Sequence, residues 1–191
     1  MNNLRSAGFS VMEMMVTLAT IGLLSAVAIS ESGNAWRRER VNSVAVELAG
    51  WLDAARRAAM KGNACQVTIT GGTLSSGATL ATASEIVSAQ AITNNCLTSQ
   101  PLSIVTSLGN STAYSIAPSG STSFKFTPRG TVNAAAANAQ LTSPIVIQIS
   151  LAGSSGPLRC VRVSEGLGLV SIGSSNSTAT TCPDSSYGSS I

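Results

Sequence analysis

The chain has 191 residues, a formal net charge of +3 and only 10% charged residues, against about 25% in typical soluble domains. Its mean hydropathy of +0.30 is high and makes a membrane-associated segment the first feature to look for. The sequence contains no histidine, which excludes Ser-His-Asp triads, Cys-His pairs and His-ligated zinc sites.

The first element is an apolar run over residues 9–30, which we expect to form a transmembrane helix. The 21 residues from Phe9 to Ile29 (29 − 9 + 1) hold one charge, Glu13. As a helix they would span about 31 Å at roughly 1.5 Å per residue, which matches a hydrocarbon core of about 30 Å. The run is longer than the roughly 7–15 apolar residues of a secretory signal. One arginine precedes the run and three follow it closely. The flanking positive charges therefore do not determine which end of the helix faces the cytoplasm.

Glu13 is the unusual residue of this run. A carboxylate inside an apolar segment costs on the order of 3 kcal/mol on insertion scales. Either Glu13 reaches the membrane interface near the helix end, or a positive group neutralises it, because an opposite charge within about 4–6 Å favours the ionised form. A neighbouring chain could supply that group, which would then set the register between the two helices.

The segment Gly8-Phe9-Ser-Val-Met-Glu13-Met-Met-Val-Thr-Leu-Ala19 resembles the class III signal of type IV prepilins and type II secretion pseudopilins. The resemblance implies that a prepilin peptidase cuts after Gly8 and removes a leader of residues 1–8. It implies N-methylation of the new first residue, Phe9, and pairing of Glu13 with the N-terminal amine of a neighbouring subunit during assembly.

The same resemblance implies a location and a set of partners. The chain would be a single-pass protein of the bacterial inner membrane, with the head in the periplasm, and would later enter a pilus or pseudopilus. Its partners would be membrane lipid before assembly, an inner-membrane assembly platform and other pilins or pseudopilins.

Residues 31–63 are expected to form an amphipathic helix. Ser32-Gly33-Asn34 is expected to fray, and Gly62-Asn63 to end the helix. The helix should pack on a globular head through one apolar stripe with spacings of three and four, and its arginines should form a solvated face. That stripe comprises Val41, Val44, Leu48, Leu52, Ala55 and Ala59. The segment from Leu52 to Asn63 resembles the "L-x-x-A-R-x-x-A" helix end of the GspH/FimT subfamily of minor pseudopilins and pilins.

Residues 64–191 are expected to form an antiparallel β-rich head, which gives an α+β class. Residues 71–123 are rich in Ser, Thr, Ala, Gly and Asn and suggest an insertion or a variable sheet edge. Phe124 and Phe126 should share a face before a turn at Pro128-Arg129-Gly130, a segment similar to the "F-x-P-x-G" part of GspH/FimT heads. The tail from Ser174 is expected to be loop. Expected strands cover 65–70, 85–92, 102–108, 144–151, 158–163 and 167–172, with 144–151 and 158–163 forming a hairpin.

The four cysteines are widely spaced and contain no C-x-x-C pair, which argues against zinc. Three disulfide connectivities exist. We favour Cys65–Cys96 and Cys160–Cys182, because each closes a local loop and an exported head lies in an oxidising compartment. Four buried thiols are the alternative.

No catalytic constellation or phosphate-binding loop is present in the sequence, and acidic residues in the head are few. We therefore expect a structural subunit that is not an enzyme and uses no cofactor. A single-span membrane protein with an exported domain is the plain alternative.

DNA binding during natural transformation is the alternative from another functional class. Some FimT-like minor pilins bind DNA through a "G-R-V-R"-like stretch, but the matching residues here are Gly168-Leu169-Val170-Ser171, and the absence of both arginines argues against DNA as a partner. Arg159 and Arg162 are three residues apart on one expected strand, so their side chains should point to opposite faces of the sheet. The candidate DNA contacts are Lys125, Arg129, Arg159 and Arg162.

Overall fold

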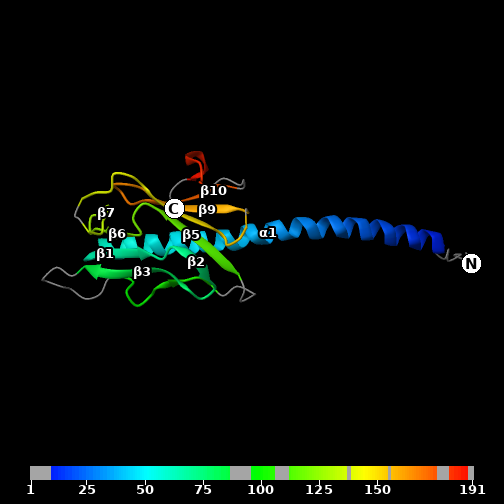
Figure 1. Ribbon diagram of the computed structural model, residues 1–191, viewed down its shortest axis with the longest axis horizontal. Helices are drawn as coiled ribbons and strands as arrows, with labels where there is room; N and C mark the ends of the chain where they lie inside the picture. The colour runs from blue at the N-terminus through cyan, green and yellow to red at the C-terminus, as the bar shows by residue number, and fades with distance from the viewer. Residues whose placement is uncertain are drawn as a thin grey trace, which may run out of the picture. The chain divides into compact units, whose positions relative to one another are not determined.

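The computed structural model describes residues 10–86, 96–105, 112–136, 139–154, 156–175 and 181–188. The chain divides into two units, Met1–Trp36 and Arg37–Ile191. Helix α1 (Val11–Met60) belongs to both units, and all the described strands belong to the second (Figure 1). These strands are β1 (Ala64–Ile69), β2 (Gly72–Ser75), β3 (Thr79–Ile86), β4 (Leu102–Ser103), β5 (Ala113–Ser119), β6 (Ser123–Phe126), β7 (Val132–Ala134), β8 (Ile145–Leu151), β9 (Leu158–Val163) and β10 (Val170–Ser175).

Helix α1 runs through the segment that was expected to fray. Residues 32–34 are helical, so the predicted interruption at Ser32-Gly33-Asn34 is wrong. One glycine inside a helix costs only about 1 kcal/mol relative to alanine, and serine and asparagine cost less. The helix ends at Met60, where Lys61 and Gly62 donate their amides to the carbonyls of Ala58 and Ala59. The predicted end at Gly62-Asn63 is confirmed to within two residues.

Within its described residues, the second unit forms two antiparallel sheets of five strands each. Their orders are β4-β3-β1-β6-β7 and β10-β9-β8-β5-β2. The predicted α+β class, a long N-terminal helix packed on antiparallel β-structure, is confirmed. The head has two sheets rather than the single one that was expected.

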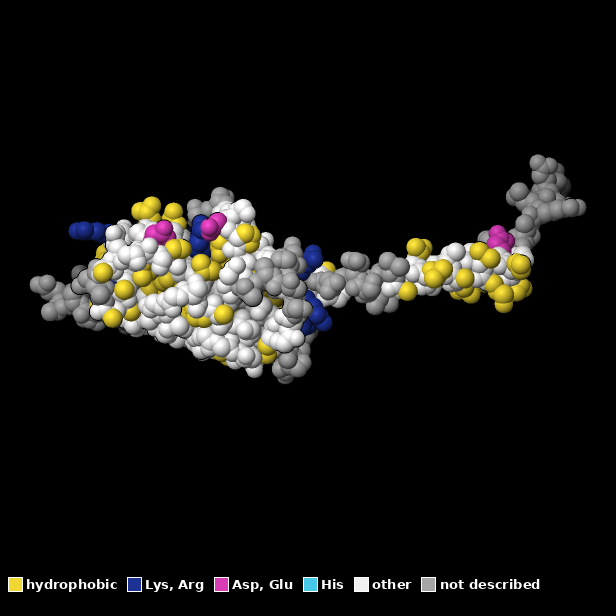
Figure 2. Space-filling view, turned by 45° about the horizontal axis from the view of Figure 1, so that its top comes forward, with side chains coloured by type: hydrophobic (Ala, Val, Ile, Leu, Met, Phe, Trp, Pro, Cys, Tyr) yellow, Lys and Arg dark blue, Asp and Glu magenta, His cyan; other side chains and the backbone are white. Residues whose placement is uncertain are grey.

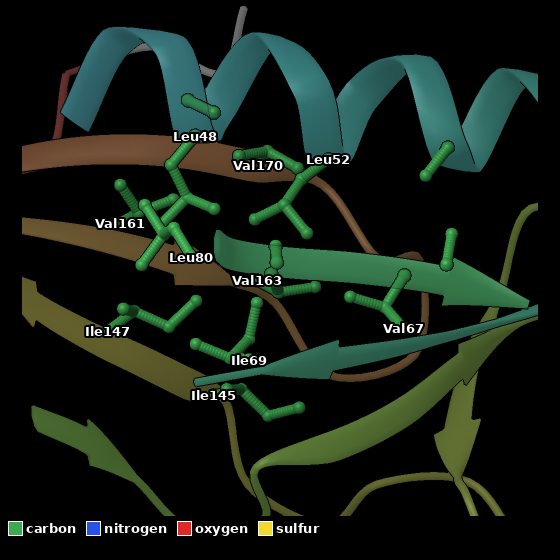
Figure 3. Close-up of a cluster of buried hydrophobic side chains, with 14 of the residues drawn as sticks. Leu48, Leu52, Val67, Ile69, Leu80, Ile145, Ile147, Val161, Val163 and Val170 are labelled. Atoms are coloured by element: carbon green, nitrogen blue, oxygen red, sulfur yellow. The ribbon is translucent and has the colours of Figure 1, made fainter. Parts of the chain in front are cut away.

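The buried stripe of α1 and the inner faces of both sheets form one hydrophobic core. All six residues of the predicted stripe are buried. In Figure 3, Leu48 and Leu52 point from the helix toward Val161, Val163 and Val170, while Val67 and Ile69 come from β1 of the other sheet. Burying such a side chain is worth about 1.5–3 kcal/mol, so the helix stripe holds the two sheets together.

The Ser/Thr-rich region is more regular than the sequence suggested. Residues 71–123 include β2, β3, β4 and β5. The expected sheet edge is present in β4 and β2, which are edge strands, whereas β3 and β5 lie inside the two sheets. Strand β5 lies between β8 and β2, and its Tyr114 and Ile116 are buried in the core. The alternation of large and small side chains in Ala113–Ser119 is the signal that compositional bias concealed.

Two predicted strands differ in position. Strand β3 begins at Thr79 rather than residue 85, and it pairs with β1 in the register Val67↔Ala83. Strand β4 covers only Leu102–Ser103. The remaining parts of these predictions, 87–92 and 106–108, lie outside the described residues.

The C-terminal half of the head follows the prediction more closely. Strands β8 and β9 form the expected hairpin, with Ile147 opposite Val161. Phe124 and Phe126 share a buried face, with ring centroids 5.5 Å apart in an edge-to-face arrangement. Strand β10 starts at Val170 rather than residue 167, because Gly166 and Gly168 adopt positive φ angles and make a turn there. The tail contains a short 3-10 helix, η1 (Asp184–Ser186).

Candidate functional site

The N-terminal unit carries an apolar helical segment whose side chains are exposed in the single chain. From Ser10 to Ala26 every side chain is exposed, and Glu13 is the one charged residue among them. Met12 and Leu23 are 76% and 73% exposed. Figure 2 shows hydrophobic side chains on the visible face of this segment and one acidic group near its start. A helix that is apolar all round is normally buried in protein or lipid.

The polar side chains of this segment satisfy their own hydrogen bonds. The hydroxyls of Thr17, Thr20 and Ser25 donate to the carbonyls of Met14, Thr17 and Ile21 at 2.8–2.9 Å. Such bonds to the preceding turn give these three hydroxyls acceptors within the helix. Glu13 is the one charged group of residues 10–26, so its carboxylate has the greatest need of a polar or charged partner on transfer to an apolar environment.

Glu13 lies in the first turn of α1, where Ser10 begins the helix. The amides of Glu13 and Met14 donate to the Ser10 carbonyl at 3.0 and 3.1 Å, and the Met12 amide donates to its hydroxyl at 3.3 Å. An acidic side chain in the first turn suits the helix dipole. Gly8 and Phe9, the predicted cleavage and methylation residues, lie outside the described residues.

No helix within the described residues was found to be both long and apolar enough to cross a membrane.

Both predicted disulfides are present, Cys65–Cys96 and Cys160–Cys182. The first links β1 to the segment that precedes β4, and the second links β9 to the tail. Each pairing joins residues close in sequence, separated by 31 and 22 positions.

The candidate DNA contacts do not form one basic surface. Lys125 is buried in β6, and Arg129 is exposed in the turn that follows it. Arg159 Nε donates to Asn42 Oδ1 of α1 at 3.3 Å, whereas Arg162 Nη1 donates to Asp184 Oδ1 at 3.1 Å in the tail. The opposite orientation predicted for Arg159 and Arg162 is confirmed.

Arg159 is held in a partly buried position against the helix. Burial lowers the pKa of its guanidinium, with Arg38 adding to the shift and Glu39 opposing it. Because Arg159 is hydrogen-bonded to Asn42, its guanidinium belongs to the interface between α1 and β9 and is not positioned to bind a phosphate.

Sequence reasoning missed a groove beside the outward face of α1. A cavity of about 440 Å³ is bordered by residues of α1, by Val105, which follows β4, and by Tyr114 at the start of β5. Val46 and Val105 at its rim are 50% and 52% exposed. The available signal was an apolar residue, Val46, placed off the buried stripe. The groove is lined by Glu39, Asn42, Ser43, Val44, Val46, Glu47, Val105 and Tyr114.

Comparison with known proteins gives one solved structure to report. The chain is similar in structure to the type IV minor pilin FimU of Pseudomonas aeruginosa (strain PAO1), with 15% sequence identity and a TM-score of 0.46. The similarity covers 80% of this chain and 96% of that one. No family model and no curated protein matches the chain.

Proposed function

We propose that this chain is a minor pilin or pseudopilin of the GspH/FimT type. It is a structural, non-enzymatic subunit of a type IV pilus or type II secretion pseudopilus, and it assembles through its N-terminal helix. The observation that carries this proposal is the exposed apolar segment from Val11 to Ala26 with Glu13 as its one charge. The head supports it, because its core is complete without that segment.

The apolar segment must be covered in the cell. At about 25 cal/mol per Å² of apolar surface removed from water, such a helix is strongly driven into lipid or against other helices. The proposal assigns it to the inner membrane before assembly, with the head in the periplasm, and to a bundle of like helices afterwards. The assembly platform of the inner membrane would mediate the transfer.

Glu13 gives this transfer its specificity. In an apolar bundle an unpaired carboxylate is costly, and a neighbouring amine removes that cost. The amine proposed is the N-terminus of another subunit, exposed when prepilin peptidase cuts between Gly8 and Phe9. The pair would fix the axial position of one helix against the next.

Mutation of the proposed cleavage residue tests the assignment. Gly8→Ala should leave the chain as uncut precursor, whereas the native chain should lose residues 1–8 and carry a methyl group on Phe9. Intact-mass spectrometry of the two chains from cells with prepilin peptidase measures this directly. A native chain that still begins at Met1 would contradict the proposal and favour a plain single-span membrane protein.

A further inference from the structure

The end of the second unit where α1 enters the head is rich in arginine. Arg37, Arg38 and Arg40 lie there within one turn of the helix, and Glu39 is the one acidic residue between them. Arg37 and Arg38 are exposed, and within the described residues neither guanidinium makes an ion pair or a hydrogen bond. Figure 2 shows basic side chains at this end of the head. A surface with this excess of positive charge attracts anions.

A cavity of about 390 Å³ lies beside Arg37 at this end. It is bordered by Arg37, Thr112 and the turn 151–154 at the end of β8, and no acidic residue is among its described lining residues. Arg40 Nη1 donates to Thr112 Oγ1 at 2.8 Å, and Ser154 Oγ accepts a backbone amide at 3.1 Å. Each of the two hydroxyls keeps a proton that it can donate. The cavity therefore combines a guanidinium with two hydroxyl donors, which suits a phosphate group.

The positive charges at this end of the head repel one another. Arg159 of β9 lies close to this part of α1, where its guanidinium is hydrogen-bonded to Asn42. Burial lowers the pKa of Arg159, the charge of Arg38 lowers it further, and Glu39 opposes the shift. Arg159 is not itself a ligand, but its charge adds to that of Arg38. An anion bound near Arg38 would reduce the repulsion between the two arginines.

The length of chain between these arginines and the expected membrane span is short. Arg37 follows residue 30, the expected end of the span, by seven positions (37 − 30), or about 10 Å along a helix. The polar headgroup region on each side of the hydrocarbon core is about 5–8 Å thick. Side chains on a helix lean toward its N-terminal end, which here is the membrane side. Long arginine side chains can therefore reach back to the level of the lipid phosphates.

The arginines also depart from the usual distribution of charge around a membrane span. Lysine and arginine close to a span are normally in excess on the cytoplasmic side. The proposed orientation instead puts Arg37, Arg38 and Arg40 on the periplasmic side. An anionic partner in the periplasmic leaflet would offset this unfavourable placement, because anionic lipid attracts basic segments at the membrane surface.

We propose that Arg37 and Arg38, together with the cavity beside Arg37, bind the phosphate of an anionic phospholipid in the periplasmic leaflet before assembly. The inference rests on the proposed function, because it takes residues 9–30 to span the membrane. The position favours a phospholipid over nucleic acid, since lipid phosphates are concentrated at this level. The bound lipid would hold the head at the membrane surface, and the contact would be lost when the chain leaves the bilayer.

Native mass spectrometry of the chain purified from cells with prepilin peptidase tests this site. The chain, in a neutral detergent, is mixed with equal amounts of phosphatidylglycerol, which is anionic, and phosphatidylethanolamine, which is zwitterionic. We expect phosphatidylglycerol adducts to exceed phosphatidylethanolamine adducts several-fold. Arg37→Gln with Arg38→Gln should abolish this preference. Both side chains are exposed, and the variant keeps the hydrogen bond between Arg40 and Thr112, so the head should fold normally.

The matched control is Lys61→Gln with Arg129→Gln, which removes the same amount of charge from two exposed positions at the other end of α1. Lys61 follows the last turn of the helix, and a Cβ at Gly130, next to Arg129, would lie 3.0 Å from Met60 Sδ. The control should keep the native preference for phosphatidylglycerol, because its net charge equals that of the test variant and only the position of the lost charge differs.

Three results would overturn the proposal: equal binding of both lipids by the native chain, an unchanged preference in Arg37→Gln with Arg38→Gln, or an equal loss in the control. Inorganic phosphate added without lipid should give no adduct that depends on the two arginines; such an adduct would indicate a site for a free anion and overturn the lipid assignment. Cleavage after Gly8, measured on the same chains, keeps the two proposals separate. A cleaved chain without lipid preference contradicts only the lipid site, whereas a native chain that begins at Met1 contradicts the proposed function.

Discussion

The guanidinium carbon of Arg162 lies 4.3 Å from the centre of the Tyr187 ring, and the same arginine pairs with Asp184 at 3.1 Å. Both contacts hold the described tail, 181–188, to the face of β9 that is turned away from α1. The Cys160–Cys182 disulfide adds a covalent link on that face. Gly173 of β10 leaves room for the tyrosine, since a Cβ there would lie 2.8 Å from its Cε1. The tail is thus fixed by a cation–π contact, an ion pair and a disulfide.

Removal of the tail disulfide should destabilise the head. For a loop of the size closed by Cys160 and Cys182, the chain-entropy model gives about 3 kcal/mol. We expect Cys160→Ala with Cys182→Ala to lower the free energy of unfolding by about that amount, measured by denaturant titration of the full chain in detergent. The tail amides should also exchange faster with deuterium. Exchange as slow as in the native chain would show that the noncovalent contacts suffice.

Substitution of Gly168 should be costly for two reasons. Its φ is +61°, and a Cβ would lie 3.1 Å from Phe126 Cε1 and 3.4 Å from the Gly130 carbonyl. The matched control is Gly153, whose φ is +70° but whose Cβ would meet nothing within 4 Å. Gly153→Ala should cost about 1 kcal/mol from backbone conformation alone. Gly168→Ala should cost about 1–3 kcal/mol more, since the tight turn cannot yield without moving a core ring; equal losses would contradict this packing.

The stability contribution of Glu47 should depend on pH. Burial raises the pKa of this carboxyl in the folded chain, so the folded state binds the proton more tightly than the unfolded state. The group therefore weakens folding as pH rises through the range between the unfolded and the folded pKa. Glu47→Gln in the unassembled chain should match or slightly exceed native stability at pH 7, by less than about 0.5 kcal/mol because the group is largely exposed. At pH 3 the difference should vanish; a variant less stable than the native chain at pH 7 would contradict this.

The chain should not bind DNA through its head. The four candidate cations are separated, with Lys125 buried, Arg159 against α1 and Arg162 paired with Asp184. Phosphate binding depends on several cations acting together and weakens steeply with salt. A gel-shift titration of the full chain in detergent with duplex DNA at low salt should show no complex. A complex that disappears as salt is raised would favour the DNA-uptake alternative.

The sequence was sufficient to predict those parts of the fold that a single local pattern marks. The apolar stripe of α1 follows a strict helical period, so all of its residues, Leu48 and Leu52 among them, could be predicted to be buried. The hairpin of β8 and β9 has strong β-branched strands around a glycine turn, and the disulfides join cysteines close in sequence. Each of these features is marked by a pattern of residues close in sequence.

The missed features depend on tertiary context. Strands β3 and β5 contain Ala, Ser and Thr at positions where larger residues would normally mark a strand, and their pairing with β1 and β8 stabilises them. The groove at Val46 arises from the approach of Val105, which is 59 positions away (105 − 46). No local pattern encodes that approach.

The pairing of Glu13 in an assembled filament is the central claim, and its mutation tests that claim most directly. In cells that build the filament, the fraction of chain recovered with sheared filaments is compared for the native chain, Glu13→Ala and the control Thr17→Ala, whose hydroxyl bonds only within its own helix. We predict that Glu13→Ala remains in the membrane fraction and its recovery with filaments falls several-fold, while Thr17→Ala is recovered like the native chain. Recovery of Glu13→Ala at the native level would contradict the account.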